Sequence, residues 1–313
     1  MEQLSNNSEA TPSSLLSSGP VKVEYRIKGD QSTVKMDCEL LVVACDPRNL
    51  YNICDYTPEE CGIFDKLENF TFHTSLLKVK VPGPQDHAVI FAPNSLEEMV
   101  GNVYGFRNES AKQFGLDKAN EMEYNLVTVY QLEGSLPKPS SAKEFEAILK
   151  QQLKDIDWWP FSDEYQILKS VTTPYFDHFS NDDLIDGLPW KLLNQQGQNN
   201  TLYVHAFTCF ESVLDCWAYS ELMMSSVHSA RLALPAKLDA PIVILGAGAS
   251  GLLFAVRLKR LGYTNINILE STDRYGGKTH TIVEDGPFPS GSTEKTVCEL
   301  GACYLSPAYS PMT

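Results

Sequence analysis

The sequence predicts an α/β fold in which a parallel sheet of short buried strands is joined to a region of mixed sheet and helices. Three observations carry this prediction. Short, uniformly apolar runs such as 40–45 are typical of strands that are covered on both faces. Near residue 242 a strand, a glycine-rich turn and a helix follow one another directly. Between these segments, longer runs alternate between apolar and polar residues, as half-exposed strands do.

The first elements are a tail and a hairpin. Residues 1–20 are rich in Ser, Asn and Pro, which predicts a disordered tail. Two extended runs at 22–27 and 33–36 flank a Gly-Asp turn and predict a hairpin. The buried strand at 40–45 comes next.

The middle of the chain mixes strands with helices. We expect strands at 69–81, 87–91, 124–132 and 166–173, where the pattern is strand-like. We expect helices at 58–67, 95–100 and 141–156. This region fits a mixed sheet with helices, and by itself it indicates no chemistry.

The elements before the glycine-rich turn are a short apolar strand at 201–206 and a helix at about 210–232. Apolar residues recur along that helix at helical spacing, which indicates a face packed on the core. A linker at 235–240 leads to the strand Ile242–Leu245, which we expect to share one sheet with the runs 40–45 and 201–206.

Gly246, Gly248 and Gly251 form a GxGxxG turn between the strand and a helix expected at 252–261. The first glycine permits the tight turn, the second lets backbone approach a pyrophosphate, and the third lets the helix pack on the strand. The helix N-terminus supplies unpaired N–H groups and a positive dipole end for the phosphates. This context predicts a Rossmann-like FAD/NAD(P)-binding turn. The residues between the glycines are also expected at the cofactor: Ala247, Ala249 and Ser250.

A second strand at 266–269 ends at Glu270, which follows Gly251 by 19 residues. An acidic side chain at this place accepts hydrogen bonds from the hydroxyls of an adenosine ribose and repels a 2′-phosphate. Glu270 is therefore a candidate ribose ligand.

Two adjacent glycines stand beside two cations in Arg274-Tyr-Gly276-Gly277-Lys278. This composition suits a loop pressed against a pyrophosphate, with Arg274 as a charge partner. The alternative interpretation is a surface turn with solvated charges.

The strand, GAGASG, ILES and RYGGK in that order resemble the N-terminal signature of flavin-dependent amine oxidases and their relatives. The stretch CELGACYL, 298–305, resembles the next element of that family, where the chain returns to the flavin. The resemblance implies FAD as the cofactor and an oxidoreductase that passes hydride from a small organic substrate, such as an amine, to the flavin, with oxygen as acceptor.

The preceding residues resemble the C-terminal half of the same family. The similar stretches are VKMDCELLVVACDPRNL, TPYF and the closing strand and helix of the segment 187–227. The predicted organisation is thus a C-terminal-half-like part at 21–234, with substrate-domain sheet and closing strand and helix, followed by an N-terminal FAD-binding βαβ segment at 241–313. Three alternatives explain the reversed order: a circular permutant, a slice across two tandem copies, or a truncated gene product.

One position departs from the family pattern. The closing strand usually runs into a glycine and an acid, whereas this sequence has His205-Ala206-Phe207 and no acid before Glu211. The second hypothesis is therefore a catalytically inactive flavin-fold remnant or a binding protein. An NAD-dependent dehydrogenase is disfavoured by the diglycine loop.

No catalytic residue is indicated by the sequence. The six histidines are scattered, and a single histidine is more often structural than catalytic. Aromatic residues that could line a flavin or a cationic substrate are Tyr175, Phe176, Trp158 and Trp159, for which core packing is the simpler interpretation.

The net charge of −15 disfavours nucleic acid and anionic membranes as partners, so a small-molecule substrate is expected. No run approaches the roughly 18 apolar residues of a membrane span, and no signal peptide is recognised. The eight cysteines include no CxxC pair, which favours free buried thiols over disulfides or a zinc site. We expect an intracellular, cytoplasmic protein without a metal; the sequence leaves its oligomeric state undetermined.

Overall fold

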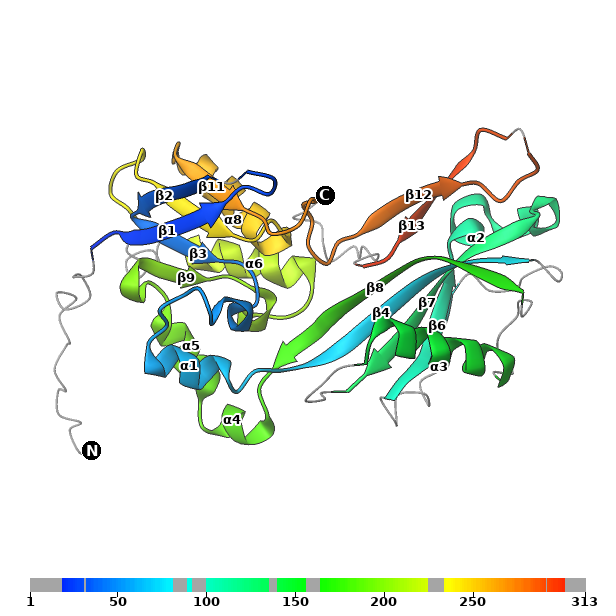
Figure 1. The fold of residues 1–313 in the computed structure, drawn as a ribbon, viewed down its shortest axis with the longest axis horizontal. Coiled ribbons are helices and arrows are strands. Elements are labelled where there is room, and N and C mark those ends of the chain that lie inside the picture. The colour runs from blue at the N-terminus through cyan, green and yellow to red at the C-terminus, as the bar shows by residue number, and fades with distance from the viewer. Residues whose placement is uncertain are drawn as a thin grey trace, which may run out of the picture.

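The computed structural model describes residues 19–30, 32–80, 89–91, 100–134, 140–155, 164–224, 234–290 and 292–301. It confirms the predicted fold class. One parallel and one antiparallel sheet carry the fold, and two further hairpins accompany them (Figure 1). Of the tail predicted at 1–20, residues 1–18 lie outside the described part of the chain.

The parallel sheet joins segments that are far apart in the sequence. Its order is β11 (Ile266–Leu269), β10 (Ile242–Leu245), β3 (Leu40–Val43) and β9 (Thr201–Tyr203). In β10, Ile242 lies opposite Leu40 of β3 on one side and Ile266 of β11 on the other. The sheet thus contains the three strands expected to share it, with β3 and β9 shorter than expected.

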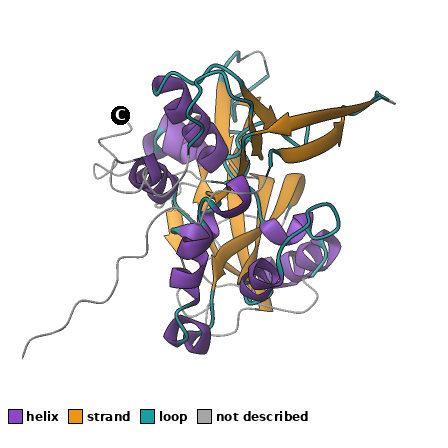
Figure 2. Ribbon diagram, turned by 90° about the vertical axis from the view of Figure 1, so that its left-hand side faces the viewer, coloured by secondary structure: helices purple, strands orange, loops and turns teal. Residues whose placement is uncertain are grey.

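Both faces of this sheet are buried, which explains the uniformly apolar runs. Successive side chains of a strand point to opposite faces. Leu40 and Val42 pack with residues of two helices, α6 (Val213–Met224) and α8 (Ala249–Arg260). Figure 2 shows helices on both sides of the strands in this part of the molecule. Of the helix predicted at 210–232, residues 225–233 lie outside the described chain.

The opposite face carries Leu41 and Val43. The elements that pack there are α1 (Pro58–Phe64), α5 (Leu188–Gln195) and the hairpin of β1 (Val21–Arg26) and β2 (Thr33–Cys38). Thr57 begins α1 with a capping box, because its side chain accepts from Glu60 N–H while the Glu60 carboxylate accepts from Thr57 N–H. The same carboxylate accepts from Tyr203 Oη at 2.6 Å and so ties α1 to β9.

The antiparallel sheet has long strands and one helical cover. Its order is β5 (Val89–Phe91), β6 (Val100–Asn108), β7 (Tyr124–Glu133), β4 (Glu68–Lys80) and β8 (Tyr165–His178). The helix α3 (Ala142–Asp155) buries Phe145, Leu149 and Leu153 near this sheet. β4 and β8 run from this sheet toward the parallel one (Figure 1). The amino-terminal end of β4 and the carboxyl-terminal end of β8 therefore connect the two regions.

β6 and α2 (Glu109–Phe114) are not among the predicted elements. The helix expected at 95–100 is wrong at residue 100, where β6 begins, and residues 95–99 lie outside the described chain. Gly101 has φ +85° and so cannot continue a helix, and β6 pairs with β7 through two register shifts. These irregularities hide the alternation by which a strand is recognised.

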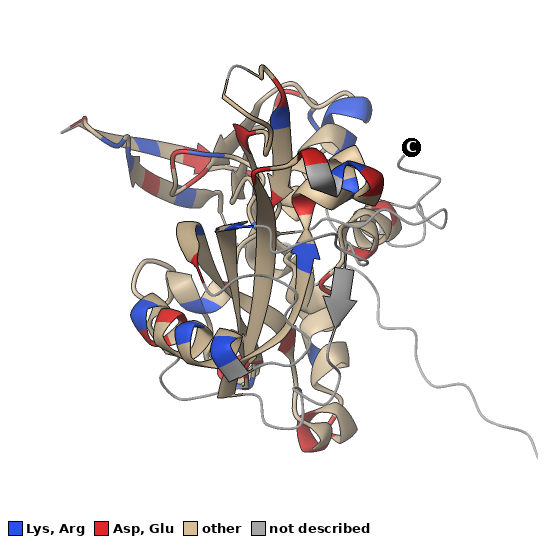
Figure 3. Ribbon diagram, turned by 90° about the vertical axis from the view of Figure 1, so that its right-hand side faces the viewer, with Lys and Arg blue, Asp and Glu red and all other residues tan. Residues whose placement is uncertain are grey.

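A last hairpin, β12 (Thr281–Asp285) and β13 (Lys295–Glu299), is bonded to the antiparallel sheet. Arg107 Nη2 donates to the Glu299 carbonyl at 2.6 Å, and Tyr124 Oη donates to the Gly286 carbonyl at 2.7 Å. Basic and acidic residues lie close together on this hairpin (Figure 3). The segment after the glycine-rich turn therefore contacts both sheets.

Candidate functional site

The GxGxxG turn requires glycine at its first and third positions. Gly246 has φ +105°, and a Cβ there would lie 3.2 Å from the Ala44 carbonyl oxygen of β3's end. A Cβ on Gly251 would lie 2.2 Å from the Gly246 carbonyl oxygen. The turn is therefore closed against both the neighbouring strand and its own helix.

The helix α8 begins at Ala249, three residues earlier than expected, with Gly248 at its N-cap. A glycine N-cap offers no side-chain acceptor to the N–H groups of the first turn. Those groups and the positive end of the helix dipole lie at the carboxyl end of β10, where an anion is stabilised.

The diglycine loop packs directly on the GxGxxG turn, a contact that the sequence does not reveal. Gly276 N–H donates to the Ala247 carbonyl at 2.8 Å, and Gly248 and Gly276 form a parallel β-bridge. Gly277 has φ +59°, and a Cβ there would lie 2.9 Å from Gly248 Cα. Two glycine-rich segments thus form one backbone surface.

Glu270 stands at the end of β11, and its carboxylate is already hydrogen-bonded. One oxygen accepts from Ala247 N–H at 2.9 Å, and the other accepts from the N–H and hydroxyl of Thr272, both at 2.8 Å. Burial alone would raise the pKa of Glu270, but these hydrogen bonds outweigh it and lower the pKa. The carboxylate is therefore charged at neutral pH.

The two cations of the diglycine loop have different surroundings. Arg274 donates to carbonyl oxygens of its own loop, at Gly277 and at Thr279 (3.1 Å for the latter). Lys278 forms an ion pair with Glu211 and lies 3.9 Å from Asp177 Oδ2. Lys278 lines the cavity described in the next paragraph. Arg274 does not line it and instead stabilises the loop through hydrogen bonds to its carbonyl groups.

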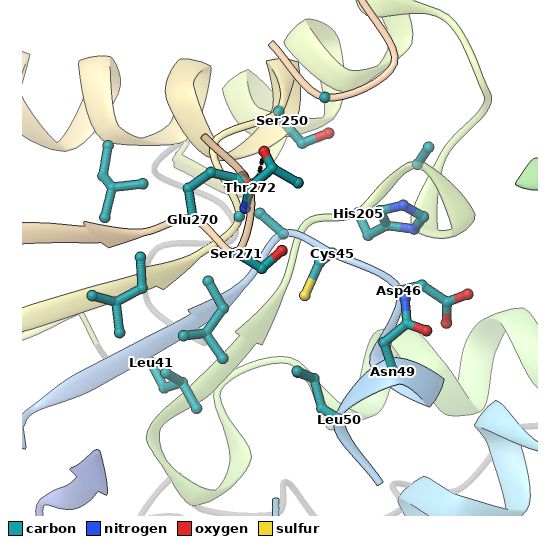
Figure 4. A pocket seen from close by; sticks show the side chains of 18 of the residues that line it. Leu41, Cys45, Asp46, Asn49, Leu50, His205, Ser250, Glu270, Ser271 and Thr272 are labelled. Carbon is teal, nitrogen blue, oxygen red and sulfur yellow. Dashed lines mark hydrogen bonds between the residues drawn. The ribbon is translucent and has the colours of Figure 1, made fainter. Parts of the chain in front are cut away.

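A cavity of about 1120 Å³ runs along the carboxyl ends of the parallel strands. One residue near each strand end lines it: Glu270 after β11, Gly246 after β10, Cys45 after β3 and His205 after β9 (Figure 4). With neighbouring strands about 4.8 Å apart, the four ends span roughly 14 Å. Ligands of open α/β sheets bind at this edge, where the strand order reverses, and that reversal lies here between β10 and β3.

The structure brings most of the predicted site residues to this cavity. The predicted residues that line it are Gly246, Gly248, Ala249, Ser250, Glu270, Gly276, Gly277 and Lys278. Ala247, Gly251 and Arg274 lie behind that surface, where they hold the turn and the loop together. The strand β1 also lines the cavity along residues 21–26, a wall that the predicted hairpin did not indicate as part of the site.

A cluster of charged side chains lines the end of the cavity near β9. Arg48 donates to both oxygens of Asp46 and, at 2.8 Å, to Asp177 Oδ1. Burial lowers the pKa of His205 to about 4, so its imidazole is neutral at pH 7. Asp46 and Arg48 come shortly after a buried strand, and this position in the sequence could have identified them as candidate site residues. Asp177 is distant from both in the chain, so no local pattern relates it to them.

The aromatic residues singled out in the sequence pack against other rings where the structure describes them. Tyr175 and Phe176 belong to a row of aromatic rings, with centroid distances of 5.1 Å from Tyr175 to Phe72 and 5.6 Å from Phe176 to Phe210. Trp158 and Trp159 lie outside the described chain. All cysteines in the described residues are free.

Among the described residues, no group of three or more His, Cys, Asp or Glu side chains is arranged to hold a metal ion. Within the same part of the chain, no helix has the length and apolar character needed to cross a membrane.

Comparisons with known proteins give one family model that matches the last part of the chain and short similarities to two curated proteins. Residues 244–312 match the model of the NAD(P)-binding Rossmann-like domain. Protein anon-37Cs of Drosophila lebanonensis is 39% identical over 71 residues, which are 23% of this chain and 11% of that protein. The L-amino-acid oxidase of Neurospora crassa is 46% identical over 48 residues, which are 15% of this chain and 7% of that protein.

Among solved structures, the fatty acid isomerase of P. acnes that produces CLA is similar with a TM-score of 0.48 and 18% identity. The likeness covers 61% of this chain and 41% of the isomerase chain. Of the two curated relatives, the chain matches only a small part of the length, 11% and 7%. What it shares with the matched family is a Rossmann-like dinucleotide-binding fold, formed around β10, the glycine turn and α8.

Proposed function

We propose that the chain binds FAD in the cavity at the strand ends and is an FAD-dependent oxidoreductase of the amine-oxidase type. One observation carries the proposal: the GxGxxG turn, the diglycine loop and the acid at the end of the next strand line one cavity. Cβ atoms added at Gly251 and Gly277 would collide with the backbone of Gly246 and Gly248. This backbone surface fits the close approach of a pyrophosphate.

The residues of the turn and loop would hold the nucleotide half of the cofactor. Gly246, Gly248 and the start of α8 would face the pyrophosphate, with Gly276 and Gly277 beside them. A carboxylate has about four acceptor positions, and Glu270 uses three in this structure. Its remaining capacity suits a ribose hydroxyl, and its charge would repel a 2′-phosphate.

Two observations favour FAD over NAD. The diglycine loop adds a second backbone surface to the glycine turn. The cavity also continues past β3 to His205 and Lys278, which gives room for a longer dinucleotide. Its volume slightly exceeds the roughly 300–1,000 Å³ of typical ligand pockets.

The flavin would supply the chemistry, by accepting hydride from a substrate C–H bond and passing electrons to oxygen. The chain's own residues would bind, orient and exclude water. An amine substrate is supported by the short similarity to a protein named as an L-amino-acid oxidase.

A second candidate is a non-catalytic protein that keeps the nucleotide site. His205-Ala206-Phe207, in place of the glycine and acid of the resembled family, favours it. Both candidate proteins would bind the nucleotide, but only the first would turn over a substrate.

The test is reconstitution of the purified chain with FAD, followed by gel filtration and a visible absorption spectrum. Retained flavin bands at near-stoichiometric amounts support the proposal, and a colourless protein that also fails to bind ADP refutes it. Flavin that is bleached anaerobically by an amine and restored by oxygen supports the enzyme. Bound flavin that no amine or amino acid reduces favours the non-catalytic alternative.

A further inference from the structure

Asp177 lies near the end of β8 with one carboxylate oxygen unsatisfied. Its side chain is 2% exposed. Oδ1 accepts from Arg48 Nη2 at 2.8 Å and from Asn69 Nδ2 at 3.2 Å. Oδ2 is buried and has no hydrogen-bond partner among the described residues. A buried acceptor of this kind costs free energy unless a donor reaches it.

The side chains nearest to Oδ2 do not supply that donor. Lys278 Nζ and His205 Nδ1 are each 3.9 Å away, beyond hydrogen-bonding distance. Lys278 is paired with Glu211 instead. His205 Nδ1 accepts a long hydrogen bond from Phe207 N–H at 3.5 Å, which assigns the unprotonated nitrogen to the side of Asp177.

The backbone next to Asp177 is strained. Phe176 has φ +54°, and the other non-glycine residues with positive φ in the described chain are Asn199 and Asn200. Asparagine tolerates this conformation, whereas a bulky aromatic residue rarely adopts it. Such strain is most common at functional sites. Here the strained residue is the neighbour of Asp177, which lines the cavity near the end of β8.

The charges around Oδ2 disfavour an anion. Three carboxylates, Asp46, Asp177 and Glu211, stand against two cations, Arg48 and Lys278. Arg48 pairs with Asp46 and with Oδ1, and Lys278 pairs with Glu211 and, at 3.9 Å, with Oδ2, so the cluster as a whole keeps one negative charge in excess. A neutral or cationic donor is stabilised there, and a second anion is repelled.

We propose that Asp177 Oδ2 accepts a hydrogen bond from an N–H or O–H group of the ligand in the cavity, and that this end of the cavity selects a neutral or cationic donor over an anion. The inference rests on the proposed function, because it assumes that the cavity holds a ligand. Two sources supply such a donor: a hydroxyl or N–H of the cofactor's flavin half, or the ammonium group of an amine substrate.

The test compares the wild-type chain with Asp177→Asn and with Asn69→Ala. Asparagine keeps an oxygen for Arg48 and replaces the Oδ2 acceptor by a donor. Asn69→Ala removes the other bond to Oδ1 and leaves Oδ2 intact, which makes it the matched control. Four ligands are titrated: ADP, FAD, benzylamine and benzoate. Binding of ADP and FAD is measured by calorimetry. Binding of benzylamine and benzoate is measured as a shift of the thermal unfolding midpoint; these two ligands share a phenyl ring and carry opposite charges.

We expect all three chains to bind ADP alike, because ADP lacks the flavin half. If the donor belongs to the cofactor, Asp177→Asn binds FAD about tenfold more weakly. If it belongs to the substrate, FAD binding is unchanged and the benzylamine shift of the wild type is lost in Asp177→Asn. In both cases benzoate gives a smaller shift than benzylamine in the wild type.

Three results would overturn the proposal. Asp177→Asn could bind FAD and benzylamine like the wild type, it could lose ADP to the same degree as FAD, or benzoate could bind as well as benzylamine. Failure of the wild type to bind ADP and FAD refutes the proposed function separately, and the benzylamine arm then decides the role of Asp177. A wild type that binds neither the nucleotides nor benzylamine refutes both.

Discussion

Substitution of Gly277 by alanine tests the contact between the two glycine segments. A Cβ at this position would lie 2.9 Å from Gly248 Cα, whereas carbon atoms pack at about 3.5–4.0 Å. The loop must therefore retreat by roughly 0.6–1 Å. The positive φ of +59° costs alanine about 1–2 kcal/mol, and overpacking adds about 1–3 kcal/mol.

Gly187→Ala is the matched control, because Gly187 also has a positive φ, +75°, and its nearest neighbour to an added Cβ is Trp190 at an ordinary 3.7 Å. The control is expected to carry only the strain, and Gly277→Ala to be less stable by about 1–3 kcal/mol more. The assay is urea unfolding, combined with titration of FAD, whose affinity should fall at least about tenfold in Gly277→Ala alone. Equal destabilisation of both variants with unchanged FAD affinity would show that the diglycine loop does not pack closely on the glycine turn at the cofactor.

Three further predictions concern titrating groups. Folding lowers the pKa of Glu270, so the ionised carboxylate stabilises the folded chain at pH values above its unfolded pKa. This stabilisation is lost as the pH falls through the folded pKa, and Glu270→Gln should make the urea unfolding midpoint less sensitive to acid. His205 must stay neutral, so the wild type should lose stability as pH falls from about 6.5 to about 4, and His205→Asn should lose less. The Cys216 thiol has its pKa lowered to about 7 by a hydrogen bond from Cys209, so its alkylation by iodoacetamide should be half-maximal near pH 7. The midpoint should shift upward in Cys209→Ala, which removes the donor, as mass spectrometry would show.

The parts of the fold that the sequence predicts are those with local signals. Gly246 and Gly251 stand where a strand turns into a helix, and the close contacts of both positions require glycine. The buried strands Leu40–Val43 and Ile242–Leu245 read as uniform apolar runs because both faces are covered. Such features depend on neighbouring residues, so one sequence is enough to recognise them.

The features that the sequence does not predict depend on contacts between distant segments. β6 escapes recognition because Gly101 and the register shifts interrupt its alternation. Asp177 meets Arg48 from 129 residues away, so no spacing in the sequence relates them. The contact of Gly276 with Ala247 is likewise set by how the loop folds back, which the diglycine alone does not specify.

Hydrogen–deuterium exchange with and without FAD shows whether the two glycine segments form one dinucleotide site. FAD is expected to slow exchange in residues 246–251, in 274–278 and along Val21–Arg26, with little change in Ala142–Asp155 on the far sheet. Slowed exchange confined to other segments, or none at saturating FAD, would show that the two segments do not form such a site.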